Sequence, residues 1–165
     1  MVSIRLATPF DIPLILHLIR QLAIYEREPD AVHATESGLL RDGFGSRPHF
    51  ECLIAEKKSA DGVIQPAGFA LTFTSYSTWR GRPGVHLEDL FVLPKFRRQG
   101  IAKALVARVA ARAVELGYDR LGLHVLDWNQ PAIDFYHRVG AHFLSEWRIM
   151  RVSGDALTAL AEQGQ

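Results

Sequence analysis

The sequence predicts a mixed α/β domain, with an antiparallel first half and one βαβ unit in the second half. Three strand-like runs, residues 50–56, 68–76 and 85–92, follow one another through connections rich in turn formers, as antiparallel hairpins do. The strongly helical residues 101–117 then separate the third of these runs from a strand-like run at 120–126, which is the order of a parallel crossover. The predicted order of elements is therefore β-α-α-β-β-β-α-β-α-β.

The N-terminal elements are predicted from apolar periodicity. Apolar side chains alternate over residues 2–7, which indicates a first strand. Apolar residues then recur at helical spacing after Asp11, which we expect to cap a helix that ends near Pro29. A shorter helix is predicted after Thr35, closed by the turn formers of residues 42–45.

The C-terminal third is predicted to contain two more helices and a last strand or hairpin. Gly117 ends the long helix, and Asn129 is placed to cap a helix over residues 130–140. Residues 141–152 are predicted as a strand or hairpin, and residues 155–163 as a short terminal helix.

Composition indicates one soluble globular domain over residues 1–165. Hydrophobic residues make up 48% of the chain and charged residues 22%, and no repeat or linker interrupts it. The formal net charge of +1 creates no global field for nucleic acid or anionic lipid. Since the chain has neither a signal-peptide core nor a run of ~20 apolar residues, we expect a cytoplasmic protein that is not bound to a membrane.

The cysteine and histidine content bears on redox and metal chemistry. Cys52 is the single cysteine, which excludes an intrachain disulfide and a cysteine-based zinc site. It lies in an apolar run and is expected to be a buried structural thiol. The seven histidines show no ligand spacing, so no metal is predicted.

A basic turn that contains glycine separates the third strand-like run from the long helix. The N-terminus of a helix presents unpaired backbone N–H groups, which together with the helix dipole favour an anion. Gly100 and Ala102 would let phosphate oxygens approach the backbone. Four side chains add local positive charge: Lys95, Arg97, Arg98 and Lys103. The alternative is a plain turn with solvated basic residues, and the turn alone does not decide between them.

The spacing Arg97-x-x-Gly100-x-Ala102 fits neither the dinucleotide fingerprint nor the Walker loop. It resembles the R/Q-x-x-G-x-G/A motif of the GCN5-related N-acetyltransferases (GNAT), which holds the pyrophosphate of acetyl-CoA. The stretches LEDLFVLPKFRRQGIAKAL, LHVLDWNQPAIDFYHRVGA and EWRIMR resemble the diamine (spermidine/spermine-type) acetyltransferase branch of that superfamily, as do HLIRQLAIYE, DGFG and CLIAE. The resemblance extends from about Arg5 to Arg151, and YSTWRGR and LDWNQ look most like enzymes that acetylate thialysine.

The resemblance implies the GNAT fold, a mixed and mostly antiparallel central sheet flanked by helices, with strands that splay apart at the acetyl-CoA site. It also implies that a neutral primary amine attacks the thioester carbonyl directly. Because an alkylammonium has a pKa near ~10.4, the acceptor must lose a proton before attack, and the departing thiolate benefits from a proton donor.

Two residues match the family's acid and base. Tyr136 matches the tyrosine that protonates the leaving sulfur, and Glu88 matches the glutamate that accepts the amine proton through water. The alternative for Tyr136 is an aromatic packing residue, and the alternative for Glu88 and Asp89 is a solvated strand edge. Because side chains alternate along a strand, Glu88 and Asp89 are expected to face opposite sides of the sheet.

The resemblance also implies which residues bind the cosubstrate. The strand that pairs with the pantetheine arm is matched by Leu90, Phe91 and Val92, where a free N–H could polarise the thioester oxygen. The pyrophosphate turn comprises Arg97, Arg98, Gln99, Gly100, Ile101, Ala102 and Lys103. Asn129 matches an asparagine that contacts the cosubstrate and could equally be a plain N-cap. Arg138 matches a position near the CoA phosphates, and His137 precedes it where the family often has a lysine.

Three further residues match the acceptor site of the family. Glu26 matches an acid that meets the distal ammonium, Asp89 an acid that lines the amine pocket, and Trp79 an aromatic wall. The alternatives for Glu26 and Trp79 are ordinary helix surface and loop packing. Polyamine enzymes carry an aspartate two residues before this tryptophan, where the chain has Ser77, so a shorter or zwitterionic amine is favoured.

The sequence thus predicts an acetyl-CoA-dependent N-acetyltransferase that acts on a small primary amine: a thialysine-like amino acid, a diamine or a polyamine. Two alternatives stay open. A protein or peptide acceptor would require an open, shallow groove near Glu26, and a CoA-binding module would bind the cosubstrate without chemistry. Members of this branch are commonly homodimers to which the C-terminal strand contributes, so a homodimer is expected.

Overall fold

The computed structural model describes residues 1–164, which form two compact units, Met1–Val125 and residues 126–164. The first unit contains a five-stranded sheet and helices α1, α2 and α3, whereas the second contains helices α4 and α5. No helix of the described residues is long and apolar enough to cross a membrane.

The sheet of the first unit has the strand order β1-β2-β3-β4-β5. Its strands are β1 (Val2–Leu6), β2 (Glu51–Lys58), β3 (Ile64–Ser77), β4 (Arg82–Val92) and β5 (Leu121–Leu123). The first four strands pair antiparallel with their sequence neighbours, and β4 pairs parallel with β5 across helix α3 (Ile101–Glu115). These pairings confirm the predicted antiparallel first half and the βαβ unit.

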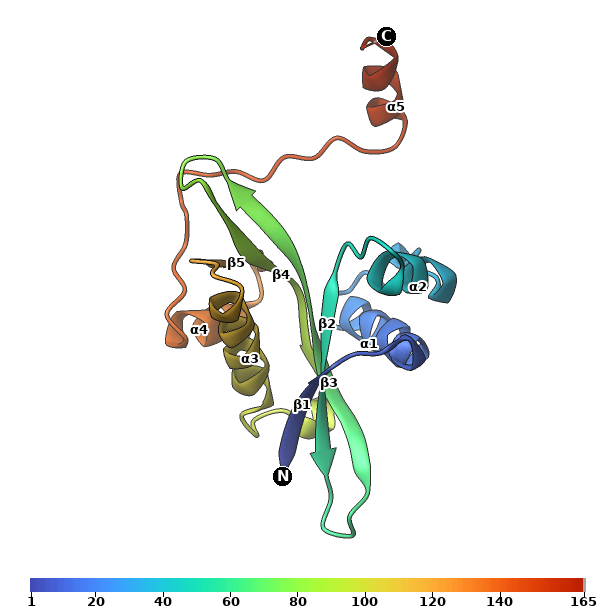
Figure 1. Cartoon of the computed structure of the whole chain (residues 1–165), viewed down its shortest axis with the longest axis vertical. Helices are drawn as coiled ribbons and strands as arrows, with labels where there is room; N and C mark the ends of the chain where they lie inside the picture. The colour runs from blue at the N-terminus through green and yellow to red at the C-terminus, as the bar shows by residue number, and fades with distance from the viewer. Residues whose placement is uncertain (165) are drawn as a thin grey trace. The chain divides into compact units, whose positions relative to one another are not determined.

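Helices cover both faces of this sheet, with α1 (Ile12–Tyr25) and α2 (Glu36–Phe44) on one face and α3 on the other (Figure 1). Short 3₁₀ helices flank them: η1 (Pro9–Asp11), η2 (Pro29–Ala31) and η3 (Pro94–Phe96). The core on the α1 face includes Ile15, Leu18, Cys52, Ile54, Phe69, Leu71 and Phe91. Cys52 is 3% exposed, and burial raises the pKa of its thiol to about 12, as expected for a structural cysteine.

Asp11 is the N-cap residue of α1, as predicted, but its side chain makes no capping hydrogen bond. Both of its carboxylate oxygens instead accept hydrogen bonds from the Arg5 guanidinium at 2.8 Å, and one also accepts the Thr8 backbone N–H at 2.7 Å. These bonds from Arg5 hold the pKa of Asp11 well below its usual range. α2 begins directly after Thr35, as predicted, and the Thr35 hydroxyl caps it by accepting the Gly38 N–H at 3.1 Å.

The second unit contains α4 (Gln130–Arg138) and α5 (Asp155–Glu162), both close to the predicted helices. The Asn129 side chain caps α4 by accepting the Ala132 N–H at 3.4 Å. The predicted strand or hairpin at residues 141–152 is wrong, because within the described chain this segment joins no ladder. A strand is stable only with a hydrogen-bonded partner. The segment exposes six large apolar side chains: Phe143, Leu144, Trp147, Ile149, Met150 and Val152.

Candidate active site

The turn between β4 and α3 directs backbone amides outward. Arg98 and Gly100 both have positive φ, +62° and +78°. A Cβ at Gly100 would meet nothing within 4 Å, so the glycine is required by its left-handed backbone and the space in front of it is open. The first intrahelical bond runs from the Ala104 N–H to the Gly100 carbonyl at 3.0 Å. The amides before it, those of Ile101, Ala102 and Lys103, therefore have no acceptor within the helix.

The Arg97 side chain is turned back onto the first unit and does not point out from the turn. Its Nε donates to the Val92 carbonyl at 3.0 Å. Its Cζ lies 4.7 Å from the ring centroid of Tyr25 and 5.4 Å from that of Phe91, which are cation–π distances. Arg97 thus ties the end of β4 to the end of α1, a role that the motif spacing did not reveal.

The other polar side chains of the turn are exposed. Arg98 and Lys103 lie at its surface, where a phosphate could reach them. Gln99 donates from Nε2 to the Lys95 carbonyl at 3.3 Å and accepts a hydrogen bond from Lys57 through Oε1. The positive charge available to an anion therefore comes from Arg98 and Lys103, together with the helix amides.

Among the described residues of the first unit, no strand pairs with the β5 side of β4 beyond Leu87, which leaves an open edge there. The parallel ladder covers only Val85–Leu87 against Leu121–Leu123, so the two strands part there, as the predicted fold requires. The Leu93 N–H donates to the Ala67 carbonyl on β3 at 2.9 Å. Successive backbone N–H groups of a strand point alternately to its two neighbouring strands. The amides of Leu90 and Val92 therefore point to the open side, whereas the amide of Phe91 points to β3.

A β-bulge places Glu88 beside Asp89. Asp89 opposes Leu71 on β3 and Leu87 opposes Thr72, so Glu88 is the extra residue. Directly opposed side chains share a face, which puts Asp89 on the α1 face with Leu71.

Glu88 lies on the same face. The His86 and Phe73 rings, also opposed, are 4.8 Å apart, and Phe73 shares the face of Leu71 because it is two residues farther along β3. The Glu88 Oε2 atom is 3.6 Å from His86 Nε2. The expectation that Glu88 and Asp89 face opposite sides is therefore wrong, because the bulge interrupts the alternation.

Three acids form a carboxylate cluster, defined as Glu26, Glu88 and Asp89. Burial, together with the charges of Glu88 and Glu26, raises the pKa of Asp89 to about 7. Burial also raises the pKa of Glu26, which directly follows α1. Like charges that are partly buried and close together favour binding of a cation, which relieves their repulsion. The structure thus brings the predicted base together with two of the three predicted acceptor residues.

Trp79 is not brought to this cluster within the first unit. It lies in the turn beyond the Ser77–Arg82 pair, at the tip of the β3–β4 hairpin, and is 86% exposed. Asp89 lies seven residues along β4 from Arg82, which corresponds to roughly 20 Å at the usual rise of a strand. The role of Trp79 as an aromatic wall therefore stays a prediction.

Three of the predicted residues belong to the second unit. Tyr136 lies in the second half of α4, half-buried, with its ring 5.2 Å from that of Phe135. Asn129 is 7% exposed, and Arg138 is exposed at the end of the helix. Their roles toward acetyl-CoA stay predictions.

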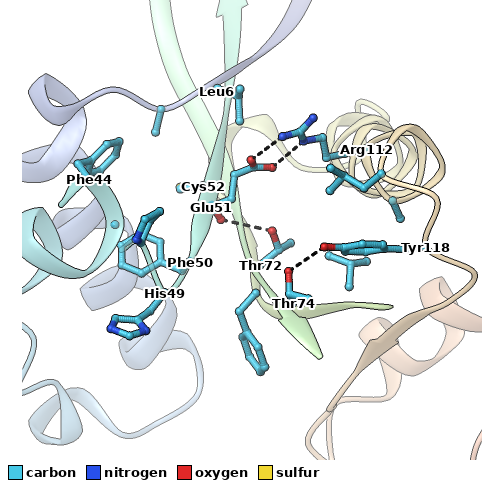
Figure 2. A pocket seen from close by; sticks show the side chains of 17 residues that line it. Leu6, Phe44, His49, Phe50, Glu51, Cys52, Thr72, Thr74, Arg112 and Tyr118 are labelled. Carbon is cyan, nitrogen blue, oxygen red and sulfur yellow. Dashed lines mark hydrogen bonds and ion pairs between the residues drawn. The ribbon is translucent and has the colours of Figure 1, made fainter. Parts of the chain in front are cut away.

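A pocket of about 320 Å³ lies near the far end of α3 (Figure 2). The Arg112 guanidinium donates to both oxygens of Glu51 at 3.2 Å, and the Thr74 and Tyr118 hydroxyls are 3.3 Å apart. Arg112 lies about 18 Å along α3 from Gly100. None of the predicted site residues lines this pocket, so it is separate from the pyrophosphate turn.

Two histidines beside the carboxylate cluster were not predicted as site residues. His86 contacts Glu88 as described above, and the ring centroids of His86 and His124 are 4.7 Å apart. The sequence could have indicated His86, because it lies two residues before Glu88 on the same strand. It could not have indicated His124, because the contact of His124 with His86 depends on the parallel register of β4 and β5. Among the described residues no group of histidine, cysteine and acidic side chains could hold a metal ion.

Comparisons with known proteins agree with this fold. The solved structure of AAC(6')-Iy in complex with the bisubstrate analogue CoA-S-monomethyl-acetylneamine has a TM-score of 0.70 and 24% identity, over 93% of this chain and 98% of that one. The sequence profile of the Acetyltransferase (GNAT) family matches residues 17–141.

Curated relatives extend over nearly the whole chain. It is 44% identical over 166 residues to a thialysine N-epsilon-acetyltransferase of Bos taurus, covering 97% of each protein. It is 35% identical to the L-ornithine N5-acetyltransferase NATA1 of Arabidopsis thaliana, covering 95% of this chain and 86% of that protein. The fold is therefore that of an acetyltransferase, and the chain belongs to the acetyltransferase (GNAT) family. It is an N-acetyltransferase, and the predicted resemblance to the thialysine-type branch is confirmed.

Proposed function

We propose that the chain transfers the acetyl group of acetyl-CoA to the terminal primary amine of a small amino acid or diamine, as one catalytic domain over residues 1–165. The observation that carries this proposal is the carboxylate cluster, in which Glu88 and Asp89 lie on β4 directly before Leu90 and Val92, and Glu26 follows α1. The carboxylate cluster attracts a cationic amine, and the open edge of β4 offers backbone amides to the cosubstrate.

The turn and the open edge fit acetyl-CoA. The amides at the start of α3, with exposed Arg98 and Lys103 beside them, suit the pyrophosphate. The outward amides of Leu90 and Val92 suit the extended pantetheine arm, which can pair with a strand edge as a peptide does. Asn129 and Arg138 are proposed to contact the same cosubstrate. When bound, acetyl-CoA supplies the activated acetyl group.

The acids and Tyr136 are proposed to divide the proton chemistry. Glu26 and Asp89 hold the ammonium by charge, and Glu88, whose side chain is 53% exposed, accepts its proton through water. Tyr136 is proposed to donate its phenolic proton to the leaving sulfur. A tyrosine phenol has a reference pKa near ~10, so this type of side chain can serve as an acid at neutral pH.

The acceptor class is inferred from the relatives and from one residue of the chain. The named relatives act on thialysine and L-ornithine, both amino acids with a terminal side-chain amine. Ser77 removes an acid that polyamine enzymes carry, which favours a zwitterion over spermine. We also propose a cytoplasmic homodimer, since the apolar side chains exposed on residues 141–152 form a surface that a second copy could cover.

A steady-state assay tests this function. Purified protein is given acetyl-CoA and a panel of thialysine, lysine, ornithine, putrescine, spermidine and a lysine peptide. We expect the highest kcat/KM with an amino acid acceptor, and calorimetry should show CoA binding. Absence of turnover with every amine, in protein that is folded and binds CoA, would leave only the CoA-binding module. Preference for the peptide would favour a protein acceptor.

A further inference from the structure

His86, Glu88 and His124 form a continuous chain of titratable side chains on the α1 face of β4 and β5. His86 is 14% exposed at its side chain and lies between the other two. Its Nε2 atom is 3.6 Å from Glu88 Oε2, and its ring centroid is 4.7 Å from that of His124 in an edge-on arrangement. The His124 residue is exposed to solvent. The chain thus leads from the predicted base to the surface.

The parallel register and one glycine bring the two histidines together. His86 is paired with Gly122 on β5, and His124 lies two residues farther along, on the same face. A Cβ built on Gly122 would lie 3.7 Å from His86 Nδ1, so the imidazole covers the surface that a side chain would occupy. The glycine leaves the His86 ring free to extend across β5 to His124.

We propose that His86 and His124 form a proton relay that carries the acceptor's proton from Glu88 to solvent. The inference rests on the proposed function, because it begins with the ammonium of the acceptor. The N–H bond of the ammonium breaks and its proton passes through water to a Glu88 oxygen. The Glu88 O–H bond then breaks as His86 Nε2 takes the proton, and His86 releases its other ring proton toward His124 and water. The relay then carries no net charge, but His86 holds its proton on Nε2, and proton exchange with water returns the ring to its starting tautomer before the next turnover.

The protonation state of His86 suits this role. Burial and the neighbouring His124 lower the pKa of His86, and the charge of Glu88 opposes them. Glu88 on β4 and His124 after β5 are the titratable groups that influence it, whereas Phe73 on β3 is uncharged. A histidine with a lowered pKa is neutral at pH 7, so one ring nitrogen is free to accept a proton.

The 3.6 Å separation of Glu88 and His86 is longer than a hydrogen bond. A water between them, or a rotation of the half-exposed Glu88 side chain, closes that gap. A bound ammonium and the cosubstrate would cover the carboxylate cluster, and Glu88 would then lose its direct route to solvent. The relay supplies the remaining route, and it restores the Glu88 carboxylate before the next amine binds.

The test compares His86→Gln and His124→Gln with His17→Gln, a matched control at an exposed position of α1. We expect H86Q to lower kcat about tenfold, a part of what a direct acid–base group contributes, with the KM for acetyl-CoA unchanged. The acidic limb of the kcat–pH profile should shift or vanish in H86Q. Added imidazole should restore part of the activity of His86→Ala, whereas H17Q should behave like the wild type in every assay.

The outcomes separate the two proposals. If H86Q and H124Q keep the kcat and pH profile of the wild type, the relay is wrong while the acetyltransferase stands. A lower kcat with an unchanged pH profile and no rescue by imidazole would also overturn the relay, because that pattern indicates loss of packing only. If H86Q does not fold, the exposed H124Q alone decides by its pH profile. A wild type that acetylates no amine refutes the proposed function instead.

Discussion

The turn before α3 and the carboxylate cluster on β4 are two halves of one candidate site, built by different means. The turn is made of backbone: Arg98 and Gly100 adopt positive φ, and they are followed by amides that have no acceptor within α3. The cluster is made of side chains: a bulge puts Glu88 and Asp89 on one face of β4, and Glu26 comes from the end of α1. Burial and these neighbouring charges raise the pKa of Asp89 to about 7. A backbone site tolerates most changes of side chain, whereas a site made of side-chain charges is altered whenever one of those side chains is replaced.

The largest expected effect is at Glu88 in the cluster. Glu88→Gln keeps the size of the side chain but removes the proposed base, so kcat should fall about 10²–10³-fold, with CoA binding retained. Steady-state kinetics and calorimetry measure the two quantities. Glu146→Gln, at an exposed position of the second unit, is the matched control and should keep full activity. An active E88Q would move the base to another residue.

A change at Gly100 tests the backbone half. Gly100→Val meets no steric neighbour but must hold φ near +78°, a left-handed conformation that costs about 1–2 kcal/mol. The turn is expected to relax, and CoA affinity should fall about tenfold by calorimetry, since 1.4 kcal/mol is a factor of ten. Gly117→Val, with φ of +73° and equally open space at the other end of α3, should lose stability without losing CoA affinity. Equal affinity in G100V would refute a backbone site.

Asp89 should show opposite effects on stability and on acceptor binding. A carboxyl whose pKa is raised on folding binds more protons in the native state, so native stability falls as pH rises from about 4 to about 7. Asp89→Asn should therefore be more stable than the wild type at pH 8, by about 1–3 kcal/mol in urea unfolding, and show little gain at pH 4. Its KM for the amine should rise.

Asp30→Asn, an exposed acid in η2, controls for the change of net charge in that comparison. The raised pKa of Asp89 also predicts a proton release when the acceptor binds. Binding of a cationic amine to the wild type near pH 7 should release protons from Asp89, seen as a dependence of the binding enthalpy on the buffer. Proton-neutral binding would mean that the amine does not reach the cluster.

The smallest expected effect is at the exposed side chains of the turn. Arg98→Gln should weaken CoA binding only about two- to fivefold, and less at high salt, because exposed charges contribute little once they are screened. Arg20→Gln on α1 is the control. A loss as large as that of G100V would show that side chains, rather than amides, hold the phosphates.

The same contrast explains what the sequence could predict. The strands, the hairpins and the Gly100 turn follow from local pattern, because apolar alternation and glycine placement act over a few residues. The bulge at Glu88 and the inward Arg97 could not be predicted, because each depends on a partner strand or helix distant in sequence. The predicted strand at 141–152 was wrong for a related reason: its pattern fits a strand, but a ladder needs a neighbour.

The inert thiol of Cys52 has a consequence for a protein that handles an activated thioester. Thioester exchange requires a thiolate, and a pKa of about 12 with 3% exposure leaves almost none at neutral pH. The sole sulfhydryl of the chain is therefore protected from acylation by the thioester. Because Cys52 is buried, the rate at which an added alkylating reagent modifies it should report the rate of global opening of the molecule, and mass spectrometry can measure that rate.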